Sequence, residues 1–279
     1  MTIALDIDGT ITDIDHFIPD SVALYFQQLY REGWQFVFIT GRIFSFALMT
    51  LNKLTFPYLL ALQNGAELLD MPGKQCIHRS YLNFSIIPLL DELYKEQEDD
   101  FLIYVGYDKG DYAYFRPDRF TAKMLAYLKK LERVSAKPWK AVNSFEQCGK
   151  IQFPLIKCIG SRDVLELLDQ QLQPLKVSQK IKTTIICDPI SQYFYFALIT
   201  CKDADKGKAI QKFMEHFSLK RPLITAGDDY NDIPLFQQGD VCIAMDGSPE
   251  PLQNLAHIIA PPAHKKGIIE GLQNAIKKI

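Results

Sequence analysis

The order of hydrophobic and polar residues predicts short buried strands that alternate with amphipathic helices. Residues 2–5 and 222–226 are brief β-prone apolar runs, and each is followed by an acidic turn that contains glycine. Residues 36–39 form a further apolar run, and residues 21–32 before it have the spacing of an amphipathic helix. Strands that alternate with helices are typical of βαβ units, so the pattern predicts an α/β fold with a parallel sheet.

Two acidic clusters directly follow two of the predicted strands. Asp6 and Asp8 follow the first strand, and Asp228, Asp229 and Asp232 follow the strand at 222–226. In an open α/β sheet, ligands bind outside the carboxyl ends of the strands, so the two clusters are expected to meet there. Asp6 and Asp8 project to the same side of an extended segment, about 6.5 Å apart. This arrangement suits a divalent cation.

The first cluster also has a simpler interpretation. Asp, Gly and Thr are common turn formers, so Asp6 to Thr10 alone would fit a solvated turn after a strand. The second cluster favours a functional site, because so many acidic groups in one tight loop repel one another unless a cation compensates them.

Four short motifs occur in a fixed order along the chain. They are Asp6-Ile7-Asp8-Gly9-Thr10, Phe38-Ile39-Thr40-Gly41-Arg42, Asp205-Lys206-Gly207-Lys208-Ala209, and Gly227-Asp228 with Asn231-Asp232. Together they resemble the motifs of the haloacid dehalogenase (HAD) superfamily, and within it those of the Cof-like sugar-phosphate phosphatases. The resemblance implies a Rossmann-like, doubly wound parallel sheet core with an inserted α+β cap domain. We expect the core at 1–82 and 194–279 and the cap, with the residues that set specificity, at 83–193.

The resemblance also implies a role for each motif residue. Asp6 is the expected nucleophile, which forms an aspartyl-phosphate, and Asp8 is the expected general acid and base. Thr40 and Lys206 complete the catalytic set because they stabilise the charge of the transferring phosphoryl group. The expected substrate-binding residues are Thr40, Gly41, Arg42, Lys206 and Asn231. The expected ligands of Mg²⁺ are Asp6, Asp8 through its main-chain carbonyl, Asp228 and Asp232.

Three of these residues have structural alternatives. Lys206 and its charged neighbours would also fit a solvated helix entry, and Thr40 would fit an N-cap for a helix beginning near Arg42. Arg42 itself would fit a solvated or helix-facing arginine. For Thr40 the two roles are not exclusive.

Composition narrows the class of partner and the compartment. The chain of 279 residues is 48% hydrophobic and has a formal net charge of −2, without a basic stripe, so neither nucleic acid nor a membrane is an expected partner. Six cysteines without a CxxC pair are expected to be buried free thiols. Met1 leads directly into the first predicted strand, which leaves no room for a signal sequence, so we expect a cytoplasmic protein. A monomer or a small homo-oligomer is expected.

The sequence therefore predicts a magnesium-dependent phosphatase that hydrolyses a small phosphorylated metabolite, with a sugar phosphate as the expected class. A phosphomutase that uses the same covalent step is one alternative. A noncatalytic protein that binds a phosphometabolite is another, although it would have no need of a nucleophile paired with an acid/base group.

Overall fold

The computed structural model describes residues 1–12, 16–135, 138–188, 191 and 193–279, and these divide into two compact units. The first unit comprises residues 1–79 and 204–279, and the second comprises residues 80–203. The chain thus leaves the first unit once and returns to it, so the second unit is an insertion.

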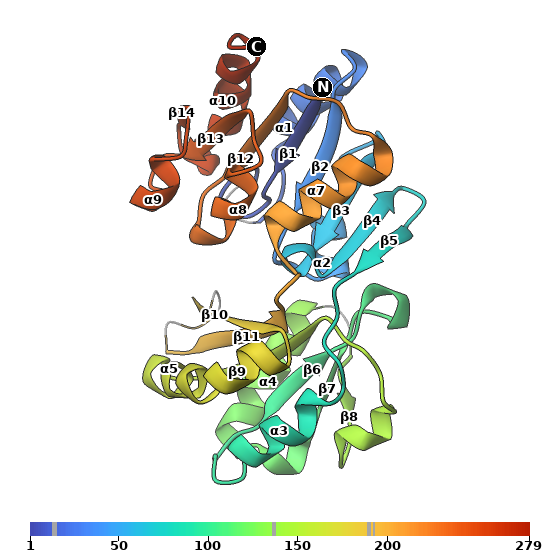
Figure 1. Cartoon of the computed structure of the whole chain (residues 1–279), viewed down its shortest axis with the longest axis vertical. Helices are drawn as coiled ribbons and strands as arrows, with labels where there is room; N and C mark the ends of the chain where they lie inside the picture. The colour runs from blue at the N-terminus through green and yellow to red at the C-terminus, as the bar shows by residue number, and fades with distance from the viewer. Residues whose placement is uncertain (13–15, 136–137, 189–190, 192) are drawn as a thin grey trace. The chain divides into compact units, whose positions relative to one another are not determined.

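The first unit is built on one sheet with the strand order β14-β13-β12-β1-β2-β3-β4-β5 (Figure 1). Six of these strands are parallel neighbours, from β14 to β3, and the other two form an antiparallel extension. The strands are β1 (Thr2–Leu5), β2 (Gln35–Ile39), β3 (Tyr58–Leu62), β4 (Glu67–Met71), β5 (Gln75–Arg79), β12 (Leu223–Gly227), β13 (Val241–Met245) and β14 (Ile258–Ala260).

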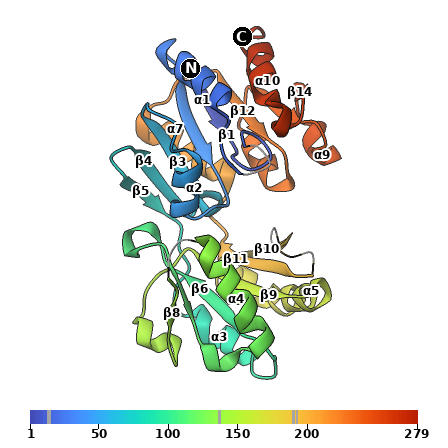
Figure 2. The ribbon, with the colours of Figure 1, turned by 180° about the vertical axis from the view of Figure 1, so that it is seen from behind.

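Helices cover both faces of this sheet, as the two opposite views show (Figures 1 and 2). Val37 and Ile39 of β2 pack in one hydrophobic cluster with Phe213 of α7. Phe36 and Phe38 point the other way and contact Phe26 of α1, with ring centroids 5.1 and 6.1 Å apart. The helices are α1 (Asp20–Arg31), α2 (Phe44–Thr50), α7 (Lys206–Phe217), α8 (Ile233–Phe236), α9 (Glu250–Gln253) and α10 (Gly267–Ile276). The predicted doubly wound α/β core is confirmed.

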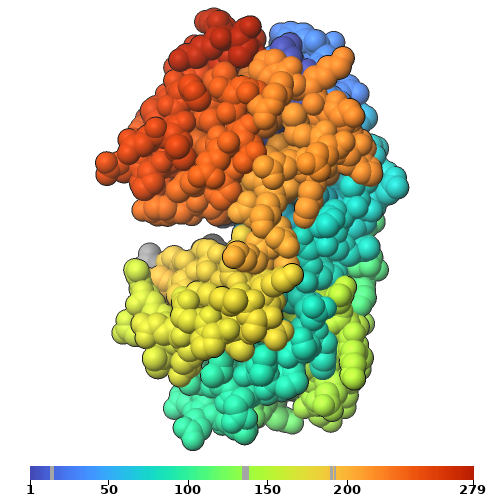
Figure 3. Space-filling view, in the orientation of Figure 1, coloured from blue at the N-terminus to red at the C-terminus, as the bar shows by residue number. Residues whose placement is uncertain are grey.

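The second unit has its own sheet, with the strand order β10-β11-β9-β6-β7-β8, and its own core. Its strands are β6 (Phe101–Tyr104), β7 (Ala113–Phe115), β8 (Lys140–Ala141), β9 (Leu155–Gly160), β10 (Ile181–Cys187) and β11 (Tyr195–Cys201). Its helices are α3 (Ile86–Leu93), α4 (Ala122–Ser135), α5 (Arg162–Gln171) and α6 (Gln173–Ser178). Helices α3 and α5 pack on one face of the sheet, and Val164 and Leu167 of α5 are exposed. In the space-filling view the yellow segment that contains α5 lies at the surface of this unit (Figure 3).

The unit boundaries differ from those expected. The expectation placed residues 194–279 in the core, whereas the structure places β11 in the second unit, because it pairs with both β9 and β10. The expectation of buried cysteines is also wrong for Cys187, which is exposed at the end of the edge strand β10. None of the described helices combines the length and the apolar character needed to cross a membrane.

Candidate active site

The site forms where two neighbouring parallel strands end. Strands β1 and β12 pair with Leu5 opposite Ala226, and the Asp6 amide donates to the Ala226 carbonyl at 3.0 Å. Asp6 and Asp228, which are far apart in the sequence, therefore leave the sheet at the same edge. The predicted meeting of the two acidic clusters is confirmed.

Gly9 allows the loops after these strands to approach closely. Its φ is +65°, a left-handed conformation that suits glycine, and a Cβ there would lie 1.9 Å from Asp228 Oδ2. Any other residue at position 9 would displace the Asp228 carboxylate.

Lys206 joins the two acidic clusters. It is the first residue of α7, whose N-terminus is capped by Asp205 Oδ1, the acceptor for the amides of Gly207 and Lys208 at 3.0 and 3.1 Å. Its side chain is 1% exposed, and Nζ lies 2.6 Å from Asp6 Oδ1 and 2.6 Å from Asp232 Oδ1. Lys206 is thus a buried ionic bridge and not a solvated helix entry.

Asp232 fixes both the lysine and the loop that carries Asp228. Its Oδ2 accepts from the amides of Asp228 and Asp229 at 3.0 and 3.1 Å, while Oδ1 receives Lys206. Gly227 permits this fold, because a Cβ there would lie 2.4 Å from Asp232 Cγ. Both oxygens of Asp232 are therefore engaged by protein groups.

The carboxylates of Asp6, Asp228 and Asp232 lie close together and shift the pKa values of Asp6 and Asp228. Burial raises the pKa of Asp6 well above its usual value, against the opposing effect of Lys206, and Asp232 and Asp228 raise it further. Burial first, and then Asp232, raise the pKa of Asp228 to about 7. The pKa of Lys206 is raised because Asp232 and Asp6 outweigh the effect of its burial. The site carries more negative charge than one lysine neutralises.

This charge and geometry suit a divalent cation. One oxygen each of Asp6, Asp228 and Asp232 lies within 4.8 Å of the others. Hard carboxylate oxygens are the ligands that Mg²⁺ prefers, and a cation would relieve the repulsion that raises the pKa values of Asp6 and Asp228. The Asp8 side chain is not part of this group.

Asp8 is held by Arg42, a contact that the sequence did not predict. Arg42 Nε and Nη2 donate to the two oxygens of Asp8 at 2.8 and 2.5 Å. The Arg42 side chain is 9% exposed, and its guanidinium also contacts the Phe46 carbonyl and the Thr50 hydroxyl. His16 Nδ1 lies 3.6 Å from Asp8 Oδ1 on the exposed side. The structure thus places Arg42, an expected substrate ligand, on the expected general acid/base.

Thr40 lies at the end of β2, fully buried. Its Oγ1 accepts from the Arg42 amide at 3.1 Å, which leaves its O–H free to donate to another group. Helix α2 begins at Phe44 with Ile43 as its N-cap, so the interpretation of Thr40 as an N-cap is wrong.

A pair of asparagines connects the second and fourth motifs. Asn231 Nδ2 donates to Asn64 Oδ1 at 3.3 Å, and the Asn64 amide donates to the Thr40 carbonyl at 2.8 Å. Asn64 also lies beside Gly41, whose Cβ would be 3.5 Å from Asn64 Oδ1. Asn64 was not among the site residues expected from the sequence. Its φ of +58°, next to Gln63 at +49°, marks a turn that asparagine tolerates better than most residues.

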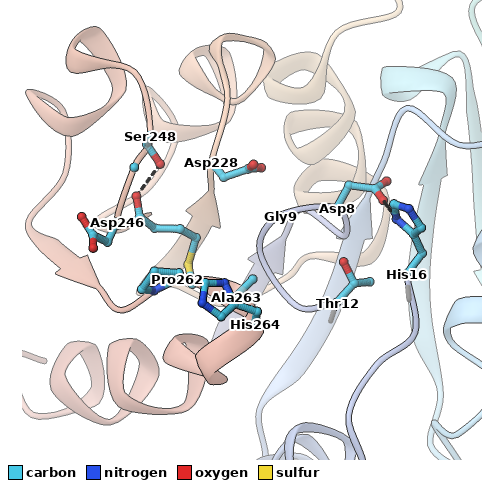
Figure 4. Close-up of a pocket in the computed structure, with 12 residues that line it drawn as sticks. Asp8, Gly9, Thr12, His16, Asp228, Asp246, Ser248, Pro262, Ala263 and His264 are labelled. Atoms are coloured by element: carbon cyan, nitrogen blue, oxygen red, sulfur yellow. Dashed lines mark hydrogen bonds and ion pairs between the residues drawn. The ribbon is translucent and has the colours of Figure 1, made fainter. Parts of the chain in front are cut away.

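A pocket of about 330 Å³ opens beside Asp8 within the first unit (Figure 4). Asp8, Thr12 and His16 lie on one side, and Asp228 and Gly9 lie between. The end of β13 and the segments that follow β13 and β14 form the other side. The residues of that far side are Met245, Asp246, Gly247, Ser248, Pro262, Ala263 and His264.

Comparison with known proteins decides the family. The model of the haloacid dehalogenase-like hydrolases matches residues 3–272, almost the whole chain. This chain belongs to that family. The expected superfamily and an enzyme of the hydrolase class are therefore confirmed.

Individual proteins that resemble this chain share little sequence identity with it. Phosphoglycolate phosphatase 2 of Saccharolobus solfataricus is 30% identical over 80 residues, which cover 29% of this chain and about a third, 34%, of that protein's length. A haloacid dehalogenase-like hydrolase from Bacteroides thetaiotaomicron has a solved structure with a TM-score of 0.81 at 19% identity, covering 98% of both chains. The solved structure of a HAD subclass IIB sugar phosphatase has a TM-score of 0.72 at 20% identity, and the match covers 98% of both chains. These structural similarities establish the fold.

Proposed function

We propose that this HAD-family hydrolase is a magnesium-dependent phosphatase that hydrolyses a small phosphorylated metabolite through an aspartyl-phosphate on Asp6. The observation that carries the proposal is the buried bridge from Lys206 Nζ to Asp6 and Asp232 at the end of β1, beside a second acid, Asp8. A sugar phosphate is the proposed substrate class, supported by the fold shared with a sugar phosphatase.

In the first half-reaction, the Asp6 carboxylate attacks phosphorus and the bond from phosphorus to the leaving oxygen breaks. Asp8 gives a proton to that oxygen, so the leaving group departs as an alcohol. Lys206, fixed 2.6 Å from Asp6, places a positive charge beside the phosphoryl oxygens, and the Thr40 hydroxyl donates to them. Asn231 and Asn64 orient the phosphoryl group from the fourth motif and the turn after β3.

In the second half-reaction, Asp8 acts as the base. It takes a proton from a water molecule, whose oxygen attacks phosphorus, and the bond from phosphorus to Asp6 breaks. Phosphate leaves, Asp6 is again a carboxylate and Asp8 again holds the proton needed for the next cycle. Arg42 positions Asp8 for both steps, because its two hydrogen bonds fix the plane of the carboxylate.

Mg²⁺ would be held by Asp6 and Asp228, with the main-chain carbonyl of Asp8 as a further proposed ligand, and it would neutralise charge on the phosphoryl oxygens. Asp232, which the sequence suggested as a ligand, is proposed to act chiefly by fixing Lys206 and the loop 227–232, because its oxygens already accept three hydrogen bonds. A cytoplasmic location, a monomer or small homo-oligomer, and the absence of nucleic-acid and membrane partners remain part of the proposal.

Phosphate release tests this function. Wild-type protein, Asp6→Asn and a matched surface control, Asp118→Asn, would be assayed on glucose 6-phosphate, a nucleotide, an aryl phosphate and acetyl phosphate, with Mg²⁺ or with chelator. We expect Mg²⁺-dependent release by the wild type and the control, and none by Asp6→Asn. Phosphate transfer to a second sugar position without release would instead support a mutase. Tight binding with no chemistry would support a binding protein.

A further inference from the structure

The second unit contains a pocket of its own, which the proposed phosphatase chemistry does not use. It has a volume of about 230 Å³ and lies between α3 and the short 3-10 helix at Phe145–Cys148. All the residues that line it belong to the second unit. Pockets for drug-sized ligands measure about 300–1,000 Å³, so this one suits a smaller molecule.

The deepest part of the pocket lining is apolar. Phe145 and Ile87 line the pocket and are only 1% and 2% exposed, and Phe84 and Pro88 add further carbon surface. The Arg116 guanidinium lies over the Phe145 ring, 4.2 Å from its centroid, and helps to hold this ring in place. Such a surface favours a ligand that contains a hydrocarbon chain.

Two carboxylates reach the pocket from its two opposing elements. Asp91 of α3 places the buried Oδ1 2.6 Å from Arg116 Nη2, although the side chain as a whole is 39% exposed. The accessible part of this carboxylate is therefore Oδ2, which accepts no hydrogen bond from the residues that the structure describes. Glu146 of the 3-10 helix is exposed, and its carboxylate likewise has no ion-pair partner among the described residues.

The basic groups beside these carboxylates already have partners. Arg116 donates hydrogen bonds of 2.6 and 2.7 Å to the two oxygens of Asp100, so one guanidinium serves both Asp100 and Asp91. Lys95 lines the pocket, and its Nζ lies 2.5 Å from Glu92 Oε2. The lining therefore carries more negative than positive charge and attracts a cation.

We propose that this pocket binds a short aliphatic diamine. One ammonium group pairs with Asp91 and the other with Glu146, and the methylene chain between them packs on Phe145 and Ile87. The two carboxylates on separate elements distinguish a diamine from a monoamine, and the apolar lining distinguishes an organic cation from a metal ion. The site is independent of the proposed phosphatase function.

Calorimetry on the full-length protein tests the proposal with putrescine as the probe. The titrations use low ionic strength, because salt weakens exposed ion pairs. We expect wild-type protein to bind putrescine more tightly than butylamine, which has the same carbon chain and only one ammonium group. Glu146→Gln and Asp91→Asn should each weaken putrescine binding by roughly two- to fivefold, the effect of one exposed ion pair, and the double variant should weaken it further.

Glu98→Gln is the matched control, because it removes the same charge from an exposed glutamate of the second unit that does not line the pocket. Its putrescine affinity should equal that of the wild type. Glu146 is exposed, so Glu146→Gln keeps the test valid even if Asp91→Asn fails to fold. Wild-type protein that does not bind putrescine, or that binds butylamine equally well, would overturn the proposal. An equal loss of affinity in Glu98→Gln and Glu146→Gln would also overturn it. Binding requires no turnover, so a failure of the phosphatase function would leave these results unchanged.

Discussion

At the scale of single residues, the closely spaced charged side chains determine the electrostatics of this site. Three carboxylates converge near the buried ammonium of Lys206, which pairs directly with two of them, Asp6 and Asp232. Burial and mutual repulsion hold the pKa of Asp228 at about 7 in the metal-free protein. A bound cation would favour the ionised form, so occupancy of the metal site and the protonation of Asp228 are linked.

This linkage predicts how pH affects the stability of the metal-free protein. The folded-state pKa of Asp228 is raised above its value in the unfolded chain, so the folded state binds the extra proton, and stability falls as pH rises from about 4 through about 7. In chelator, thermal unfolding of the wild type should occur at a lower temperature at pH 7.5 than at pH 5.5. Asp228→Asn should lose much of this dependence, and saturating Mg²⁺ should remove it. An identical pH profile for wild type and Asp228→Asn in chelator would contradict the electrostatic account.

Some site residues could be predicted from the sequence and others could not. Asp6, Asp8, Lys206, Asp228 and Asp232 stand in local motifs at strand ends or a helix start, so the fold class alone places most of them together. The pair between Arg42 and Asp8 joins side chains 34 positions apart and depends on how β1 and β2 present their loops. No local pattern encodes that contact.

At the scale of elements, the site depends on close backbone approach between helices. Helix α7 begins against α8, and a Cβ on Gly207 would lie 2.4 Å from the Pro234 carbonyl oxygen. Lys206 immediately precedes this contact, so the position of its ammonium depends on the distance between the two helices.

Gly207→Ala tests this dependence. In an unconstrained helix, replacing glycine by alanine stabilises by about 1 kcal/mol, but here the methyl group meets a backbone atom. We expect destabilisation by about 1–3 kcal/mol and a marked loss of kcat. The control is Gly73→Ala, where a Cβ would meet nothing within 4 Å. Chemical denaturation and phosphate release measure both effects, and a Gly207→Ala variant that is stabilised and fully active would refute the argument.

The hydrophobic pattern predicted the parallel strands better than it predicted the edges of each unit. Buried strands such as β1 and β12 are continuous apolar runs, whereas β4 and β5 form an antiparallel hairpin that the pattern did not resolve. The expected boundary between residues 193 and 194 placed strand β11 in the core. Its partners β9 and β10 determine its unit, and strand pairing is not visible in a single sequence.

At the scale of the whole molecule, the proposed catalytic residues all belong to the first unit. Asp6, Asp8, Lys206 and Asp228 all belong to residues 1–79 and 204–279, as does the pocket beside Asp8. Family membership, the two-part fold and the local geometry agree with covalent phosphoryl transfer by Asp6.

The most direct measurement is detection of the phosphorylated enzyme. Asp8→Asn should accept a phosphoryl group from acetyl phosphate, whose leaving group needs no proton, but should not release it efficiently, because the base that activates water is missing. After acid quenching with Mg²⁺ present, mass spectrometry should find the phosphoryl adduct on the peptide that contains Asp6, and no adduct in Asp6→Asn/Asp8→Asn. Turnover without any adduct, or an adduct on another residue, would contradict Asp6 as the nucleophile.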